Sequence, residues 1–294
     1  MKRLLVSVAM LGSLSLTLTA SPASAVFSGE GNRVLFFNDS TGSAQVYSIN
    51  PLTKGVNPLT PGPSESYPGH YSPNGKKIAY FMDAGVDFDI FMMKANGSNN
   101  HPVLSDVGDE LWPAFAPNGK QFVYVFEDPS DGYELYVANA DGSGPHQISM
   151  LPELPEVPVW APNRKRIAFT MYDGNDLEIY TIKPDGTGLD QLTDNGGNDF
   201  FGDFAPNGRR VSFTSDRSGA EQLHLMRPNG THVKRLTNGA TPVSFSSVYT
   251  ASGDNIVFSR EVGGDFELYR IMPDGSKLRR LTDNGFDDFV QLFD

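Results

Sequence analysis

The chain has 294 residues, of which 39% are hydrophobic and 20% charged, proportions typical of a globular domain. Its formal net charge of −12 at pH 7 argues against a nucleic-acid partner, which favours a basic surface, and is compatible with a cation or a basic protein. The absence of cysteine excludes disulfides and thiol chemistry, and the 30 glycines and 21 prolines favour short strands joined by tight turns.

The first 25 residues have the pattern of an export signal. Lys2 and Arg3 precede a mostly apolar stretch over 4–18, and Ala23-Ser24-Ala25 is a small-x-small cleavage pattern. A membrane anchor is the alternative, but the apolar stretch is interrupted by glycine and serine and is short for a span. We expect cleavage after Ala25, a periplasmic or secreted protein without an integral membrane span, and one domain over residues 26–294.

A dipeptide of an aliphatic residue and Ser or Thr recurs every 44 or 45 residues. Its copies are Leu59-Thr60, Leu104-Ser105, Ile148-Ser149, Leu192-Thr193, Leu236-Thr237 and Leu281-Thr282. A period of about 40–45 residues built from short strands and turns is the signature of a β-propeller. Six copies predict six blades.

One copy of the repeat predicts four antiparallel strands, named a to d from the centre outward. Apolar and β-branched residues predict strands over 111–115, 121–126, 134–137 and 146–149. Ala116-Pro-Asn-Gly119 predicts the a–b turn and Asp141-Gly142 the c–d turn.

An aromatic residue stands before each a–b turn and at the matching place near the end of the chain. These residues are Tyr71, Phe115, Trp160, Phe204, Tyr249 and Phe293. Because one blade is too small to bury its own faces, we interpret them as core between blades; stacking on a ligand is the alternative.

The two ends of the chain predict how the ring closes. The first copy begins at strand b, over 32–37, and the last segment, 288–293, matches a strand a. We therefore expect an all-β, six-bladed β-propeller of four-stranded antiparallel blades, closed by the C-terminal strand completing the first blade. Closure of this kind hides a sheet edge.

Ser/Ala-Pro-Asn-Gly, an apolar strand, an acid before Leu/Ile-Tyr/Phe, Asp/Asn-Gly and then Leu-Thr together resemble the repeat of the TolB-like (WD40-like, PD40) β-propeller family. The resemblance covers residues 29–294. It implies a relative of TolB, a periplasmic protein of the Tol–Pal cell-envelope system that carries an α/β domain before its propeller. Few residues separate Ala25 from the first strand, so we expect a propeller without that domain.

Strands that alternate in direction place the b–c and d–a loops on one face, called the loop face, and the a–b and c–d turns on the other, called the turn face. The loop face has longer, acidic loops, and function concentrates in such loops. Six d–a carboxylates are expected near the channel mouth: Glu65, Asp109, Glu110, Asp199, Asp287 and Asp288. Converging oxygens suit a hard cation, with Ca²⁺ as the candidate; a solvated rim, caps of loop amides and contacts to a polar ligand are the alternatives.

A second periodic polar position precedes the apolar pair of each strand c. Its members are Gln45, Asp89, Glu134, Glu178, Gln222 and Glu267. The regularity of this position predicts a structural partner for a neighbouring strand or loop.

Catalytic signals are weak. The five histidines share no metal-ligand spacing, and the chain contains no nucleophile elbow and no phosphate-binding loop that opens a helix. We therefore assign no catalytic residue or certain cofactor. The sequence favours a monomeric, non-catalytic binding module of the cell envelope or exterior, with a protein or peptide partner, a basic one fitting best. A carbohydrate-active lyase or hydrolase that uses rim carboxylates is the alternative.

Overall fold

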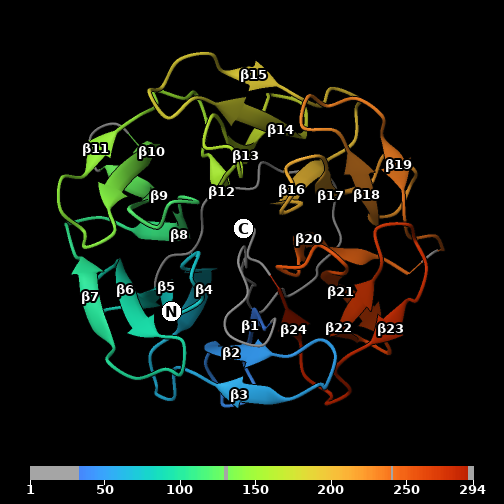
Figure 1. Ribbon diagram of the computed structural model, residues 1–294, viewed down its shortest axis with the longest axis horizontal. Helices are drawn as coiled ribbons and strands as arrows, with labels where there is room; N and C mark the ends of the chain where they lie inside the picture. Colours follow the sequence, from blue (N-terminus) through green and yellow to red (C-terminus); the bar gives the residue numbers. More distant parts are fainter. Residues whose placement is uncertain (1–32, 129–131, 240, 291–294) are drawn as a thin grey trace.

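The computed structural model describes residues 33–128, 132–239 and 241–290. The predicted export signal and Phe293 lie outside the described residues. Six four-stranded antiparallel sheets surround a central axis like the blades of a propeller (Figure 1). In the described part of the chain no helix is long and apolar enough to cross a membrane.

Blades 1 to 3 come from the N-terminal half of the chain, except for the inner strand of blade 1. Blade 1 contains β24 (Asp288–Phe289), β1 (Val34–Asn38), β2 (Gln45–Ile49) and β3 (Val56–Pro58). Blade 2 contains β4 (Ser66–Tyr71), β5 (Lys77–Asp83), β6 (Phe88–Lys94) and β7 (His101–Leu104). Blade 3 contains β8 (Glu110–Phe115), β9 (Gln121–Asp128), β10 (Gly132–Asn139) and β11 (His146–Gln147).

Blades 4 to 6 repeat the same order. Blade 4 contains β12 (Glu156–Trp160), β13 (Ile167–Tyr172), β14 (Leu177–Ile182) and β15 (Asp190–Gln191). Blade 5 contains β16 (Asp199–Phe204), β17 (Val211–Ser215), β18 (Gln222–Met226) and β19 (Lys234–Arg235). Blade 6 contains β20 (Val243–Tyr249), β21 (Ile256–Val262), β22 (Asp265–Ile271) and β23 (Arg279–Arg280).

The predicted closure of the ring is confirmed. β24 pairs with β1, with Phe289 opposite Phe37 and Asp288 opposite Asn38. The Asn38 amide also donates to Asp288 Oδ1 over 2.7 Å. Blade 1 is thus assembled from segments about 250 residues apart in sequence, and β24 pairs with the inner edge of β1 at Phe37 and Asn38.

The aromatic residues that precede the a–b turns are buried, as expected for core. Tyr71, Phe115, Trp160, Phe204 and Tyr249 are each at most 5% exposed. They belong to clusters that join neighbouring blades; Tyr71, for example, packs in one cluster with Val34 and Leu35 of blade 1.

The repeated Leu-Thr dipeptide ties strand d to strand c. Its hydroxyl accepts the N–H of the strand-c residue 14 positions earlier, and its aliphatic residue donates to the carbonyl of that same residue. The hydroxyl contacts are Val46 to Thr60 (2.8 Å), Leu135 to Ser149 (2.8 Å), Ile179 to Thr193 (2.9 Å), Leu223 to Thr237 (2.9 Å) and Leu268 to Thr282 (2.9 Å). The motif therefore supplies hydrogen bonds that β-strands of only two or three residues cannot supply alone.

Glycine in the c–d turns allows close contact between blades. Gly142, Gly186 and Gly230 have positive φ. A Cβ at each would overlap the carbonyl oxygen of Val103, Ile148 or Leu192, which lie in or directly after strand d of the preceding blade. Other residues would be strained in backbone and would push the blades apart.

Deleting residues 287–294 removes β24 and leaves the inner edge of β1 unpaired. We expect poor solubility and loss of a cooperative unfolding transition, because an exposed edge strand pairs with other chains. Size-exclusion chromatography and urea unfolding measure both properties. A soluble, cooperative monomer would contradict this account of closure.

Replacing Thr237 by Val keeps the shape of the side chain but removes the acceptor of the buried Leu223 N–H. The free energy of unfolding should fall by about 1–3 kcal/mol, the usual cost of an unsatisfied buried donor. Ser105→Val is the matched control, because Ser105 is exposed and the N–H of Ile90 contacts Glu110 instead. Equal effects of the two substitutions in urea titrations would show that the hydroxyl contact does not matter.

Candidate functional site

The six sequence-predicted site residues lie at or just before the start of four inner strands on the loop face. They are Glu65 before β4, Asp109 and Glu110 at β8, Asp199 at β16, and Asp287 and Asp288 at β24. These strands surround the central axis (Figure 1). Among the described residues, no three or more His, Asp or Glu side chains are grouped so as to hold a metal ion. The six residues are distributed around the ring.

Three of these carboxylates have partners close to the protein surface. Asp109 and Asp287 each accept a main-chain N–H from the start of strand c in the preceding blade. Asn198 accepts the corresponding N–H between blades 4 and 5. The three contacts are Phe88 N to Asp109 (2.8 Å), Leu177 N to Asn198 (3.0 Å) and Phe266 N to Asp287 (2.7 Å). Glu65 is exposed and accepts the hydroxyl of Tyr67. These contacts make Asp109 and Asp287 caps of main-chain amides at the seams between blades.

The other three carboxylates are fully buried in alternate blades. Each accepts a hydrogen bond from the residue four positions earlier in its own d–a loop. The contacts are Asp106 N to Glu110 (2.9 Å), Asn195 Nδ2 to Asp199 (2.7 Å) and Asn284 Nδ2 to Asp288 (2.8 Å). These three buried carboxylates therefore hold the d–a loops in place.

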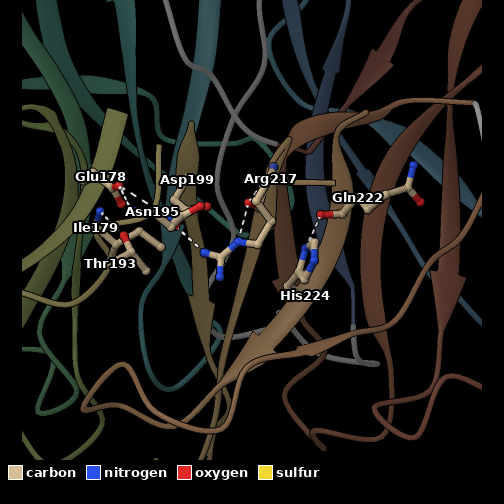
Figure 2. A network of polar contacts seen from close by, with 9 residues as sticks. Glu178, Ile179, Thr193, Asn195, Asp199, Arg217, Gln222 and His224 are labelled. Atoms are coloured by element: carbon tan, nitrogen blue, oxygen red, sulfur yellow. Dashed lines mark hydrogen bonds and ion pairs between the residues drawn. The ribbon is translucent and has the colours of Figure 1, made fainter. Parts of the chain in front are cut away.

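At the seam between blades 4 and 5, Asp199 forms an ion pair with Arg217 (Figure 2). Arg217 comes from the b–c loop of blade 5, and its Nε donates to Ser215 over 2.8 Å. Its guanidinium also lies 5.3 Å from the centre of the Phe213 ring. The arginine is partly exposed, so it connects the buried carboxylate to the surface of the loop face.

Asn195 links Asp199 to Glu178 on strand c of blade 4 (Figure 2). The main-chain N–H of Asn195 donates to Glu178 over 3.0 Å, and next to it Thr193 accepts the N–H of Ile179. Burial, together with the nearby charge of Asp199, raises the pKa of Glu178 to about 7. The periodic polar position of strand c is thus the expected structural partner of a loop.

His224 occupies the strand-c place where tyrosine is usual. It is buried, stacks on Phe213 with ring centres 5.3 Å apart, and donates from Nδ1 to the carbonyl of Gln222. Burial lowers its pKa, which favours the neutral ring. These contacts give this histidine a structural role.

The seam between blades 6 and 1 has a similar network of carboxylates, an asparagine and an arginine, but here the arginine comes from strand d and pairs with the strand-c acid. Arg280 on strand d pairs with Glu267 at 2.7 Å and with Asp283 at 2.9 Å. Asn284 donates its main-chain N–H to Glu267 and its amide to Asp288. Burial raises the pKa of Asp288 to about 6.

The seam between blades 2 and 3 also has an acidic residue on strand c, Asp89, and a buried carboxylate at the start of strand a, Glu110. Within the described residues it has no ion pair. The hydroxyl of Ser105 does not reach strand c; the longer Glu110 accepts the N–H of Ile90 instead, at 3.4 Å. Burial, together with the charges of Asp89 and Asp106, raises the pKa of Glu110 to about 8. The pKa of Asp89 rises to about 6, mainly by burial.

Sequence reasoning missed several members of these seams. Arg217 and Arg280 come from different strands and loops, so no common spacing identified them. Asn195 and Asn284 had a signal, because the tetrapeptide Thr-Asp-Asn-Gly occurs at both 193–196 and 282–285. Counting back from the aromatics did not select the buried Glu156, because β12 places it four residues before Trp160, where β8 and β16 have five.

The sequence matches the family described as the TolB beta propeller domain (PD40) over residues 13–153 and 134–290. The chain therefore belongs to the TolB-like β-propeller family. Residues in both matches contribute to the seams described above.

Solved structures share the fold at low sequence identity. Putative TolB from Agrobacterium tumefaciens is 20% identical, with a TM-score of 0.71 over 88% of this chain and 91% of that one. TolB from Acinetobacter baumannii is 18% identical, with a TM-score of 0.75 over 88% of this chain and 65% of that one, so this chain spans less than two thirds of its length. An oligogalacturonate lyase in complex with manganese is 15% identical, with a TM-score of 0.64 over 87% and 75%.

The raised carboxyl pKa values predict how stability depends on pH. Glu110 and Glu178 hold their protons up to about pH 8 and pH 7 in the fold, against a reference value of 4.5. The folded state therefore binds more protons than the unfolded state, and stability falls as pH rises. His70 and His224, whose pKa values burial lowers, act in the opposite direction below about pH 6.5.

Between about pH 6.5 and 8.5 we expect the free energy of unfolding to fall, by up to about 1.4 kcal/mol per pH unit for each proton involved. Glu110→Gln should flatten this slope, while Glu65→Gln, at an exposed carboxylate, should leave it unchanged. Urea unfolding at several pH values measures the slope. A stability that rises over this interval would contradict the assignment.

Proposed function

We propose that the protein is a non-catalytic interaction module of the cell envelope or exterior, which binds a basic protein or peptide through its loop face. Three large apolar side chains at loop tips carry the proposal: Val86, Val107 and Met150 are 80–90% exposed. All three lie in b–c or d–a loops, so they share the loop face. Apolar patches rimmed by polar or charged residues mark interaction surfaces.

Acidic residues border these tips. Asp83 and Asp87 flank Val86, and Asp106 precedes Val107. Asp87 accepts the N–H of Gly108, which links the two loops at the seam between blades 2 and 3. Negative charge beside apolar tips favours a partner with basic and apolar residues, since complementary charge accelerates and orients docking.

The buried carboxylates support a scaffold role more than a catalytic one. Glu110, Asp199 and Asp288 are fully buried and already accept hydrogen bonds from loop groups. A catalytic acid or base must reach the reacting proton of a substrate. A fixed ring of loops, held by these contacts, instead presents a broad surface of the kind that protein partners need.

The signal-like segment over residues 1–25 supports export, with residues 26–294 as the mature propeller. Family membership supports protein binding in general. The proposal that the partner is basic rests on the chemistry of the loop face alone.

Affinity capture from envelope and extracellular fractions, followed by cross-linking mass spectrometry, tests the proposal. We expect a basic protein that cross-links to the loops around Val86 and Val107 and is released by salt, because screening weakens exposed charge pairs. A variant with Val86→Ser, Val107→Ser and Asp106→Asn should lose most of this binding. The matched control is Leu52→Ser, an exposed apolar residue of the turn face, which should bind like the parent protein.

Capture that is equal for both variants, or cross-links confined to the turn face, would contradict the proposal. Cleavage of oligogalacturonates or other acidic glycans by the purified protein, abolished by a loop-face carboxylate substitution, would instead support the carbohydrate-active alternative.

A further inference from the structure

The turn face has a cavity of about 350 Å³ at the seam between blades 1 and 2, where the blue and blue-green strands of Figure 1 meet. Its lining includes three cations, two amides and one phenol: Arg33, Lys76, Lys94, Asn57, Asn96 and Tyr71. Its lining residues include no carboxylate. The cavity lies on the face opposite to the acidic loops, so it is independent of the function proposed above.

The three cations have no ion-pair partner within the described residues. Arg33 is held in place by blade 1, because Nε donates to Ser48 Oγ over 2.9 Å and Nη2 donates to the carbonyls of Ser48 and Gly55. In the described structure its Nη1 makes no hydrogen bond. One edge of a fixed guanidinium thus remains available beside two lysines.

Tyr71 forms part of the wall of the same cavity. Its side chain is fully buried, and its hydroxyl lies beside Ser48, the residue to which Arg33 also donates. The phenol ring thus helps to fix the wall against which Arg33 is held.

Blade 4 shows what fills the equivalent place elsewhere in the ring. Arg166 precedes β13 as Arg33 precedes β1, and it pairs with Asp190 at 2.5 Å. Asp190 is opposite Thr181, just as Asn57 is opposite Ser48. Blade 1 therefore has a neutral amide where blade 4 has the carboxylate, and Arg33 lacks the anion that Arg166 possesses.

We propose that this cavity binds an anionic small molecule through a phosphate-type oxyanion, placed where blade 4 has the carboxylate of Asp190. Arg33 supplies a planar fork and Lys76 and Lys94 supply point charges, the two kinds of cation that recognise phosphate. The amide of the exposed Asn57 adds a neutral donor. The volume lies in the range of ligand sites, so it has room for an organic phosphate as well as the free ion.

Calorimetric titration of the purified protein with inorganic phosphate and with glycerol 3-phosphate, at constant ionic strength set by chloride, tests the proposal. Asn57→Asp places a carboxylate opposite Arg33, as in blade 4, and should weaken binding at least about tenfold. Since Asn57 is exposed, the variant should keep its fold, which circular dichroism checks. Lys94→Gln should weaken binding about as much.

Lys120→Gln is the matched control, because Lys120 follows the a–b turn of blade 3 as Lys76 follows that of blade 2. Its affinity should equal that of the parent protein. Binding of either probe that Asn57→Asp and Lys94→Gln abolish supports the site, and tighter binding of glycerol 3-phosphate identifies an organic phosphate as the ligand. No binding of either probe, or equal binding by all variants, would overturn the proposal.

Discussion

Every blade of this protein depends on its neighbours, because a four-stranded sheet of about 40 residues cannot bury both of its own faces. The ring satisfies that requirement only when it is closed. β24 closes it through two residue pairs with β1 and the hydrogen bond between Asn38 and Asp288. The position of Asp288 in this contact explains why an acidic residue stands there: it joins the ends of the ring as well as its own d–a loop.

On the loop face, carboxylates stabilise loops and strands through hydrogen bonds and ion pairs. Asp109 and Asp287 cap strand-c amides, and Asp199 holds an asparagine and an arginine. Burying such groups raises the free energy of their charged forms, and the fold accommodates it in two ways. Asp199 and Glu267 each pair with an arginine, whereas burial raises the pKa of Glu110, Glu178 and Asp288, which have no ion pair in the described structure. An acidic composition is therefore partly architectural and does not by itself indicate a cation site.

The fold could be read almost completely from the sequence, because its information is periodic. The Leu-Thr spacing gave six blades, and the mismatch between a first copy beginning at strand b and a last segment resembling strand a gave the closure. The candidate site could be placed only in part. Counting from the aromatics selected Glu110 and Asp199, which the structure places at the starts of β8 and β16. It could not give the partners of their side chains, which come from other loops and strands.

Positions at which one copy of the repeat carries a different side chain are also positions at which function can differ. A repeated frame fixes the backbone, so that a change of side chain at one copy alters chemistry without altering the fold. Arg166 and Asp190 neutralise each other in blade 4, while Arg33 and Asn57 at the same places in blade 1 leave a positive charge uncompensated. In the same way Glu110 replaces the hydroxyl contact that Thr193 makes in blade 4. The copies that depart from the pattern, rather than those that keep it, distinguish this propeller from others with the same repeat, because the regular positions are already committed to holding the ring together.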